Sequence, residues 1–370
     1  DYYGACRYAS SLGVGGTQAV SLTLPAFGVG YYTLDLKWSS GSHRETFCVL
    51  PRPYEDAGDY SIFGLCPGNG STDEILETAA QMGVRLVRQT VPWPPFEPQR
   101  GVWRTDLLED WYAMAARHGI QMMLVLGYTP SFLAQKPANA FSDVWANNAV
   151  FTWHPTEPNE YGLYLDQVTG FARNKTVSWP ATGVMPAQGR PSRQSLPWTH
   201  SWEMWNEADI CFYMGDWNRY MDLLHMSWAA GRQRVPEAPM VYGGSTGNWA
   251  AMGMVASGSP KHCFDYVGLH TGGDVEEALR IWYSGSQQIP WCVGAPRETS
   301  HTECYAQGRR GSADYTTYQE TPGELLRCYL TLKAWREASF FRSGCLGGYI
   351  GTDEDYAPGT ALLRADTGKL

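Results

Sequence analysis

Residues 200–209 read HSWEMWNEAD, a short apolar run that ends on an Asn–Glu pair, and runs of the same kind recur along most of the chain. Seven others occur between residues 62 and 354, and segments with helical periodicity separate most of them. Short buried strands that alternate with helices are typical of repeated βα units around a parallel sheet. Because eight such strands are enough to close a barrel, we predict an α/β fold, a (β/α)8 TIM barrel, over residues 54–370.

The eight predicted strands are, in chain order, 62–67, 84–93, 122–130, 200–209, 239–246, 264–272, 297–305 and 346–354. The predicted helices lie at 73–83, 107–119, 160–173, 217–232, 275–285 and 323–344. Gly83, Gly119 and Gly344 close three of these helices, because glycine suits the left-handed position after a helix end. A doubly wound sheet is the alternative fold. It is disfavoured because no GxGxxG follows the first strand and GLCPGNGS (64–71) lacks the lysine of a P-loop.

Residues 1–53 differ from the rest of the chain. They contain alternating apolar and polar runs at 19–27, 30–38 and 45–53, separated by Gly, Ser and Pro. This pattern predicts an antiparallel sheet, and we expect a partial β-sandwich accessory segment. Such a short segment either packs on the barrel or continues a sandwich that starts earlier in a longer chain. The sequence PRP at 51–53 is the predicted linker.

Charge and composition narrow the class of partner. The formal net charge of the 370-residue chain is −9, and its basic residues are scattered, which argues against binding of nucleic acid or anionic lipid. No apolar run approaches the roughly 20 residues that cross a bilayer. The nine cysteines include no CxxC pair and the histidines show no HxH or HExxH spacing. We therefore predict neither a structural zinc site nor a metal-dependent hydrolase.

The cellular compartment is left open by the sequence. Asn69 and Asn174 each begin an N-x-[ST] pattern, which slightly favours an extracellular or periplasmic location over the cytoplasm. The start DYYGACRYAS lacks the charged and apolar parts of a signal peptide. Cys6 and Cys48 could pair within the N-terminal segment, but their spacing does not fix the connectivity.

The Asn–Glu pair of the opening stretch indicates sugar chemistry. The Asn206 amide can hold a hydroxyl group of a bound sugar, while the Glu207 carboxyl delivers a proton to the departing glycosidic oxygen. Cleavage of an acetal in this way requires a second carboxylate. Glu303, near the end of the seventh predicted strand, is the candidate. Glu298 is the alternative nucleophile if the preceding apolar run IPWCVG forms that strand instead.

Three segments give the chain a resemblance to a known group of enzymes. The retaining glycoside hydrolases of clan A have strands that resemble WEMWNEAD (202–209), MGVRLVRQTVPWPPFEPQRGVW (82–103) and LVLGYTPSFLA (124–134). Family 39-like and family 5-like members are the most similar in sequence pattern. The resemblance covers most of the predicted barrel. It implies a (β/α)8 fold in which Glu207 is the acid/base and Glu303 the nucleophile.

Side chains at the ends of the predicted strands are expected to face one shared mouth and to contact the sugar. The candidates for substrate binding are Arg88, Trp93, Tyr128, Trp202, Asn206, Trp249, His270, Tyr305 and Tyr349. Arg88 is expected to hydrogen-bond the nucleophile and keep it ionised, and its alternative role is an ion pair inside the barrel. Trp205 is out of phase with Asn206 along the strand, so we expect it to pack outward against a helix. Glu97 is expected to hold its turn together.

We therefore predict a retaining glycoside hydrolase that cleaves β-glycosidic bonds of an oligo- or polysaccharide by double displacement. Its partner is carbohydrate, and it needs no cofactor and no metal ion. The alternative is a catalytically weakened carbohydrate-binding barrel, because the seventh strand is unusually polar and Tyr349 stands where many relatives carry Trp. The sequence does not determine the sugar, the linkage, exo or endo action, or the oligomeric state.

Overall fold

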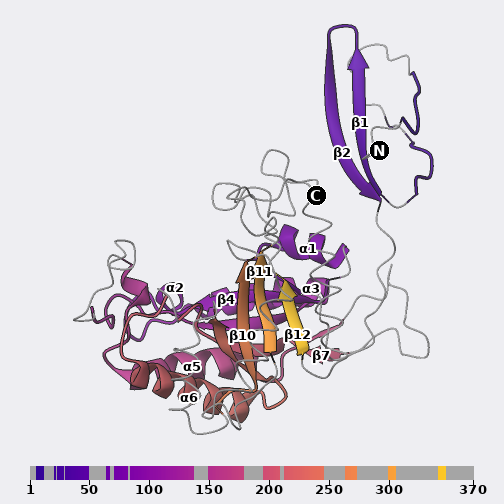
Figure 1. Cartoon of the computed structure of the whole chain (residues 1–370). Helices are drawn as coiled ribbons and strands as arrows, with labels where there is room; N and C mark the ends of the chain where they lie inside the picture. Colours follow the sequence, from indigo (N-terminus) through magenta and orange to yellow (C-terminus); the bar gives the residue numbers. More distant parts are fainter. Residues whose placement is uncertain are drawn as a thin grey trace.

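The computed structural model describes the strands of the barrel, five helices and an N-terminal hairpin (Figure 1). The described residues are 6–11, 21, 23–28, 30–49, 64–66, 71–81, 84–136, 149–178, 195–208, 212–245, 263–272, 299–305 and 341–346.

Eight parallel strands form a closed barrel, and they follow one another around it in chain order. The strands are β3 (Gly64–Leu65), β4 (Leu86–Pro92), β5 (Gln121–Gly127), β8 (Thr199–Met204), β9 (Met240–Ser245), β10 (Tyr266–Gly272), β11 (Thr299–Tyr305) and β12 (Phe341–Leu346). β12 pairs with β3 and so completes the ring. The predicted parallel eight-stranded barrel of an α/β fold is confirmed, and all carboxyl ends of the strands lie at one rim. The helix predicted at 275–285 and most of the one predicted at 323–344 lie outside the described residues.

The eighth strand is displaced from its prediction. It spans Phe341–Leu346, whereas the prediction placed it at 346–354 and treated Gly344 as the end of the preceding helix. Gly344 instead pairs in parallel with His301 of β11. The error has a physical cause: a helical pattern runs directly into an apolar strand here, and a Ser–Gly step is compatible with a helix end or with a strand interior.

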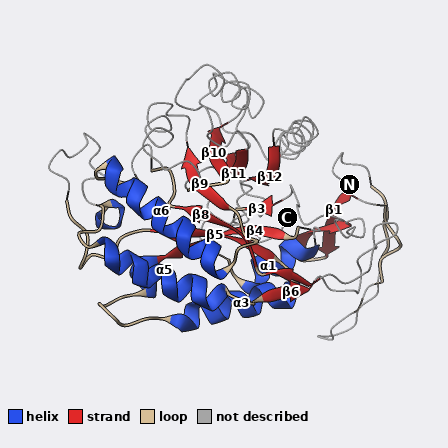
Figure 2. Cartoon of the chain, turned by 90° about the horizontal axis from the view of Figure 1, so that it is seen from below, coloured by secondary structure: helices blue, strands red, loops and turns tan. Residues whose placement is uncertain are grey.

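The described helices cover the side of the barrel formed by β4, β5 and β8 (Figure 2). They are α1 (Asp73–Gln81), the short α2 (Trp93–Phe96), α3 (Thr105–His118), α5 (Pro158–Ala172) and α6 (Trp217–Arg234). Gly119 ends α3 in the left-handed conformation, as predicted, and the Asp216 side chain caps α6 by accepting from Asn218 N at 2.8 Å. Among the described residues, no helix combines the length and apolarity that crossing a bilayer needs.

Two apolar layers lie on opposite faces of the strands. The outer layer joins strand residues such as Val87, Leu124 and Trp202 to the inner faces of the helices. The inner layer is a separate cluster that fills the barrel, made of Leu86, Met123, Val241 and Tyr266. Because side chains alternate along a strand, the next inward positions of β4, β8 and β10, towards their carboxyl ends, are free to carry polar groups.

The N-terminal segment contains an antiparallel hairpin that lies to one side of the barrel (Figure 1). Its strands are β1 (Gly30–Trp38) and β2 (Gly41–Val49), and Tyr32 stacks on Phe47 with ring centroids 5.4 Å apart. Residues 23–27 of the first run predicted here form no strand. The linker predicted at 51–53 lies outside the described residues, and the β-sandwich stays a prediction.

Two smaller features complete the described chain. β6 (Thr176–Ser178) and β7 (Ser195–Pro197) form a short antiparallel pair just before β8, and η1 (Val150–Thr152) is a single 3-10 turn before α5. Cys6 carries a free thiol, so the Cys6–Cys48 bridge considered from the sequence is not formed.

Candidate active site

The Asn–Glu pair lies in a strained turn directly after β8. Trp205 and Glu207 both have positive φ values, 65° and 43°, which non-glycine residues rarely adopt. Such strain costs about 1–3 kcal/mol for each residue and persists only where the surroundings enforce it. The turn projects Asn206 and Glu207 from the carboxyl end of a central barrel strand, the rim at which barrel enzymes carry their active sites.

Trp205 anchors the turn on the neighbouring strand β5. Its backbone N–H donates to Leu126 O at 2.7 Å, and its ring nitrogen donates to Phe212 O at 2.5 Å. Its ring covers Gly127 so closely that a Cβ there would lie 3.1 Å from the indole. The ring is fully buried, as predicted, although it packs on β5 and on Tyr213 rather than on a helix.

Gly243 of β9 supports the turn from the other side. A Cβ on this residue would overlap the carbonyl oxygens of Met204 and Trp205. The absence of a side chain therefore lets β9 approach the end of β8 until the two backbones touch.

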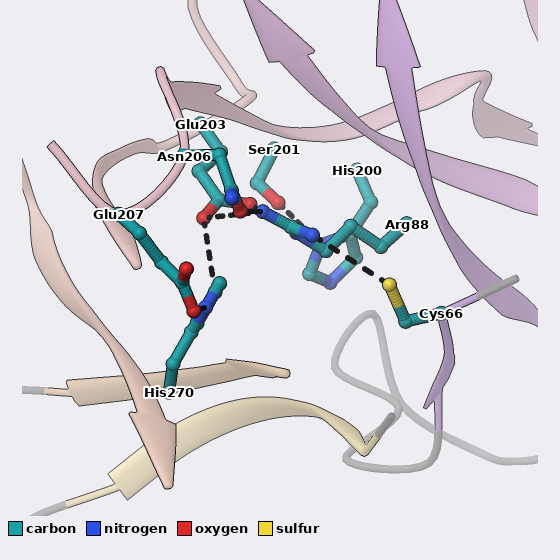
Figure 3. A network of polar contacts seen from close by, with 8 residues as sticks. All are labelled: Cys66, Arg88, His200, Ser201, Glu203, Asn206, Glu207 and His270. Carbon is teal, nitrogen blue, oxygen red and sulfur yellow. Dashed lines mark hydrogen bonds and ion pairs between the residues drawn. The ribbon is translucent and has the colours of Figure 1, made fainter. Parts of the chain in front are cut away.

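Arg88 connects Asn206 to a buried carboxylate (Figure 3). Its Nε donates to Glu203 Oε2 at 2.6 Å, and its Nη2 donates both to Glu203 Oε1 at 3.2 Å and to Asn206 Oδ1 at 2.7 Å. Glu203 is fully buried and the Arg88 side chain is 5% exposed. Arg88 Nη1 also donates to Cys66 Sγ at 3.6 Å, just beyond β3. This arrangement matches the alternative role given to Arg88, an ion pair inside the barrel.

His270 of β10 contacts Glu207. The Nδ1 atom lies 2.8 Å from Glu207 Oε1, and Nε2 on the other side of the ring lies 3.9 Å from Glu203 Oε1 (Figure 3). The imidazole is 2% exposed, whereas the Glu207 side chain keeps 14% of its surface accessible. Of these groups, Glu207 is therefore placed to meet a ligand, and His270 supports it from behind.

His200 lies near the amino end of β8 and is buried. Burial lowers the pKa of its imidazole to about 4, so the ring is neutral at physiological pH. Its Nδ1 lies 3.1 Å from the hydroxyl of Ser201. A neutral ring adds no positive charge to the interior of the barrel.

The donor set gives no support for a metal centre among the described side chains. No three His, Cys, Asp or Glu residues there lie together in a group that could hold a metal ion. The position beside Glu203 that a cation would take is filled by the guanidinium of Arg88.

β11 carries the predicted nucleophile to the same rim. In the parallel register Glu303 pairs with His270 and Tyr305 with Gly272, so the backbone of Glu303 lies one strand away from the residue that contacts Glu207. The side chains of Glu303 and Tyr305 lie outside the described residues. Glu298, Trp249 and Tyr349 lie outside them entirely, so their roles stay predictions.

Two predicted sugar-binding tryptophans are core residues instead. Trp93 is fully buried, stacks on Tyr164 at 5.3 Å and donates its ring N–H to Glu97 at 2.6 Å. Trp202 is also fully buried and packs against α6 at Gly231, where a Cβ would lie 2.9 Å from the indole. A ring with no exposed face cannot stack on a sugar, so these two assignments are wrong. Tyr128 remains a candidate because it is partly exposed at the end of β5.

Glu203 is the site residue that the sequence interpretation missed, together with the nearby Cys66. A signal was present, because Glu203 is a charged residue in the middle of an apolar strand, and such a charge needs a partner. Arg88 was identified as a possible partner in a barrel-interior pair, but the carboxylate it would meet was not named. Strand alternation also places Glu203 on the face opposite to Trp202.

No protein-family model and no curated protein matches the sequence. Solved structures do match. A family 39 glycoside hydrolase from Bacteroides cellulosilyticus aligns with a TM-score of 0.60 and 15% identity over 92% of this chain and 68% of that one. A glucosidase from Croceicoccus marinus gives a TM-score of 0.53 at 10% identity, over 85% of this chain and 66% of that one.

A family 30 subfamily 8 xylanase from Clostridium acetobutylicum gives a TM-score of 0.50 at 15% identity, over 84% of this chain and 68% of that one. The chain thus spans about two thirds of the length of each of these three proteins. At such identities the similarity is one of fold. The predicted resemblance to the (β/α)8 glycoside hydrolases of clan A is confirmed at that level.

Proposed function

We propose that this protein is a retaining glycoside hydrolase that cleaves β-glycosidic bonds of an oligo- or polysaccharide, with Glu207 as its acid/base. The observation that carries the proposal is the strained turn after β8, which projects Asn206 and Glu207 from the barrel rim. Glu207 is the carboxyl that keeps accessible surface while His270 holds its Oε1 atom. Barrel enzymes build their sites from residues at these strand ends.

The first chemical step forms a covalent sugar ester. We assign the nucleophile to Glu303, whose backbone pairs with His270 at the neighbouring strand position. Its carboxylate attacks the anomeric carbon, the bond from that carbon to the leaving oxygen breaks, and the proton of Glu207 passes to that oxygen. Because Oε1 faces His270, Oε2 is the atom of Glu207 that carries this proton.

The second step returns the enzyme to its starting state. Glu207 is now ionised and takes a proton from a water molecule, whose oxygen attacks the anomeric carbon and displaces the Glu303 carboxylate. Two displacements at one carbon leave the sugar with its original anomeric configuration. A His270 Nδ1–H can donate to Glu207 Oε1 in both steps, which keeps the carboxyl in place while its charge changes.

Asn206 is oriented to bind the sugar. Arg88 donates to Oδ1 of the side-chain amide, which leaves the NH2 group as the part that can donate to a ligand. A hydrogen bond from this group to the sugar 2-hydroxyl strengthens as positive charge develops at the anomeric carbon. Arg88 therefore acts on the substrate through Asn206 in this proposal.

The direct test is turnover of a panel of 4-nitrophenyl β-glycosides, followed by NMR of the first product. Release of the β-anomer supports retention, whereas release of the α-anomer contradicts it. A 2-deoxy-2-fluoro glycoside with a good leaving group should label Glu303, and the labelled peptide identifies the residue. Azide should restore turnover to Glu303→Ala. Rescue of Glu298→Ala in place of Glu303→Ala would move the nucleophile to Glu298.

The same experiments separate the enzyme from a carbohydrate-binding barrel that has lost catalysis. Saturable binding of an oligosaccharide, without turnover and without fluoro-sugar labelling, would favour the binding protein.

A further inference from the structure

We infer that Glu203 is a positioning residue that holds both members of the Asn206–Glu207 pair, one through Arg88 and the other through His270. This inference rests on the proposed function and adds a role for a residue that never reaches the substrate. Glu203 is fully buried and lies four positions before Glu207 on the strand that carries the pair.

The first connection runs through Arg88. The guanidinium meets Glu203 with two nitrogens, Nε at 2.6 Å and Nη2 at 3.2 Å, a fork geometry that fixes the plane of the guanidinium. The same Nη2 atom donates to Asn206 Oδ1 at 2.7 Å. A rotation of the guanidinium away from Glu203 would therefore break the bond that orients the Asn206 amide.

The second connection runs through His270. The two ring nitrogens lie on opposite sides of the imidazole, so the orientation that brings Nδ1 to Glu207 also turns Nε2 towards Glu203. At 3.9 Å the Nε2–Oε1 distance is longer than a hydrogen bond, and Glu203 attracts Nε2 across it when the imidazole carries both of its protons. The Glu203 carboxylate thereby favours this ring orientation over the flipped one.

The energetics also argue for a positional role. A buried ion pair loses most of its Coulomb attraction to desolvation, and apolar residues of the same volume often give equal stability. The inner apolar layer of the barrel shows that this interior accepts apolar side chains. What apolar residues cannot supply is a single carboxylate whose two oxygens hold Arg88 and whose Oε1 also faces His270.

The test compares Glu203→Gln with a matched control, Glu97→Gln. Both native residues are fully buried glutamates with two hydrogen-bonded oxygens, and Glu97 stands apart from the catalytic pair. For each variant, kcat/KM is measured on three β-glycosides of the sugar that the wild type turns over best. They are the phenyl glycoside, the 2,4-dinitrophenyl glycoside and the phenyl 2-deoxyglycoside.

The phenyl glycoside depends on both connections, and each of the other two substrates is independent of one of them. The dinitrophenyl group leaves without a proton, so it is insensitive to the position of Glu207. The 2-deoxy sugar lacks the hydroxyl that Asn206 holds. For Glu203→Gln we expect a loss of about 10²-fold on the phenyl glycoside, since small misplacement of a catalytic group costs about that much. The losses on the other two substrates should be smaller, and Glu97→Gln should give one common factor on all three.

A common factor for Glu203→Gln as well would overturn the inference, because it would mean a general loss of folded enzyme. A second measurement is independent of turnover: the ¹⁵N resonances of the His270 imidazole should shift in Glu203→Gln and stay unchanged in Glu97→Gln. Unshifted His270 resonances would also overturn it. Failure of the wild type on every glycoside would reject the proposed function itself, which is a different result.

Discussion

Two fully buried glutamates, Glu97 after β4 and Glu203 within β8, are held in opposite ways. Glu97 accepts from Trp93 Nε1 at 2.6 Å and from Gly101 N at 2.7 Å, each four residues away in the chain. Glu203 meets Arg88, which is 115 residues away, and His270 from a third strand. One carboxylate closes a local turn, and the other joins elements that meet only in the finished barrel.

This difference distinguishes a glutamate that only stabilises the structure from one that supports the proposed active site. A locally satisfied carboxylate needs little beyond its own segment and leaves nothing for a ligand. A carboxylate satisfied by distant strands ties their positions together, and here those strands, β4 and β10, carry Arg88 and His270, which contact Asn206 and Glu207. The comparison therefore predicts that changes at Glu97 affect stability alone, whereas changes around Glu203 affect the chemistry.

The largest expected effect comes from the acid/base itself. Glu207→Gln keeps the shape of the side chain but removes its proton, and general acid–base catalysis contributes about 10²–10⁴-fold. We expect kcat/KM for the phenyl glycoside to fall by that factor with an unchanged unfolding transition. Equal activity of Glu207→Gln and Glu97→Gln would show that Glu207 is not the acid/base.

The second largest effect is expected from removal of the Arg88 guanidinium, which should destabilise the barrel. Arg88→Met leaves Glu203 buried without its charged partner, which costs about 3–5 kcal/mol in urea unfolding. The matched control is Arg100→Met, because Arg100 pairs with Glu157 at 2.8 Å while its side chain is 51% exposed. An exposed pair is worth at most about 1 kcal/mol. Similar losses in the two variants would show that Arg88 is not needed to balance Glu203.

The pH dependence of stability tests the same interior. The pKa of His200 is about 4 in the folded protein, against 6.5 for a histidine exposed to water. The unfolded chain therefore binds more protons between these values, and folding stability falls as the pH drops from 6.5 towards 4. The full difference corresponds to about 3 kcal/mol. In His200→Asn this slope should flatten, and an unchanged slope would show that His200 is not the group responsible.

The smallest effect is expected at the locally closed turn. Glu97→Gln turns an NH2 group towards either Trp93 Nε1 or Gly101 N, so one buried donor loses its acceptor at a cost of about 1–3 kcal/mol. The midpoint of urea unfolding should fall while kcat/KM per folded molecule stays the same. A selective loss on one of the three glycosides would mean that this turn also supports the substrate.

The order of the barrel strands was predictable because each apolar run is short, and helical periodicity separates most of them. The place of the last strand was not, since the residues before Gly344 have helical periodicity although Phe341–Leu346 is a strand. Local signals also predicted the role of Glu97, whose two partners lie within four residues. Contacts of this kind are visible in the sequence itself.

The roles of Trp202 and Glu203 were harder to predict, because the two-residue alternation of β8 ends at Met204 and does not continue to Asn206. Trp202 was predicted to bind sugar because it lies near the end of a predicted strand, and counting by twos from Asn206 would place it on the same face. The positive φ of Trp205 resets that phase, so Glu203 faces the interior and Trp202 faces α6. Backbone strain of this kind depends on tertiary contacts with Leu126 and Phe212, which no local pattern reveals.

Gly243 has a consequence for protein engineering. A graft of this site into another barrel scaffold would fail if it copied the acidic residues alone. Any side chain at the position equivalent to Gly243 would displace the backbone of the turn that carries Asn206 and Glu207. The transferable unit is the block of adjacent strands from β4 to β10, which carries Arg88 and His270 and keeps Gly127 and Gly243 where β5 and β9 meet the turn after β8.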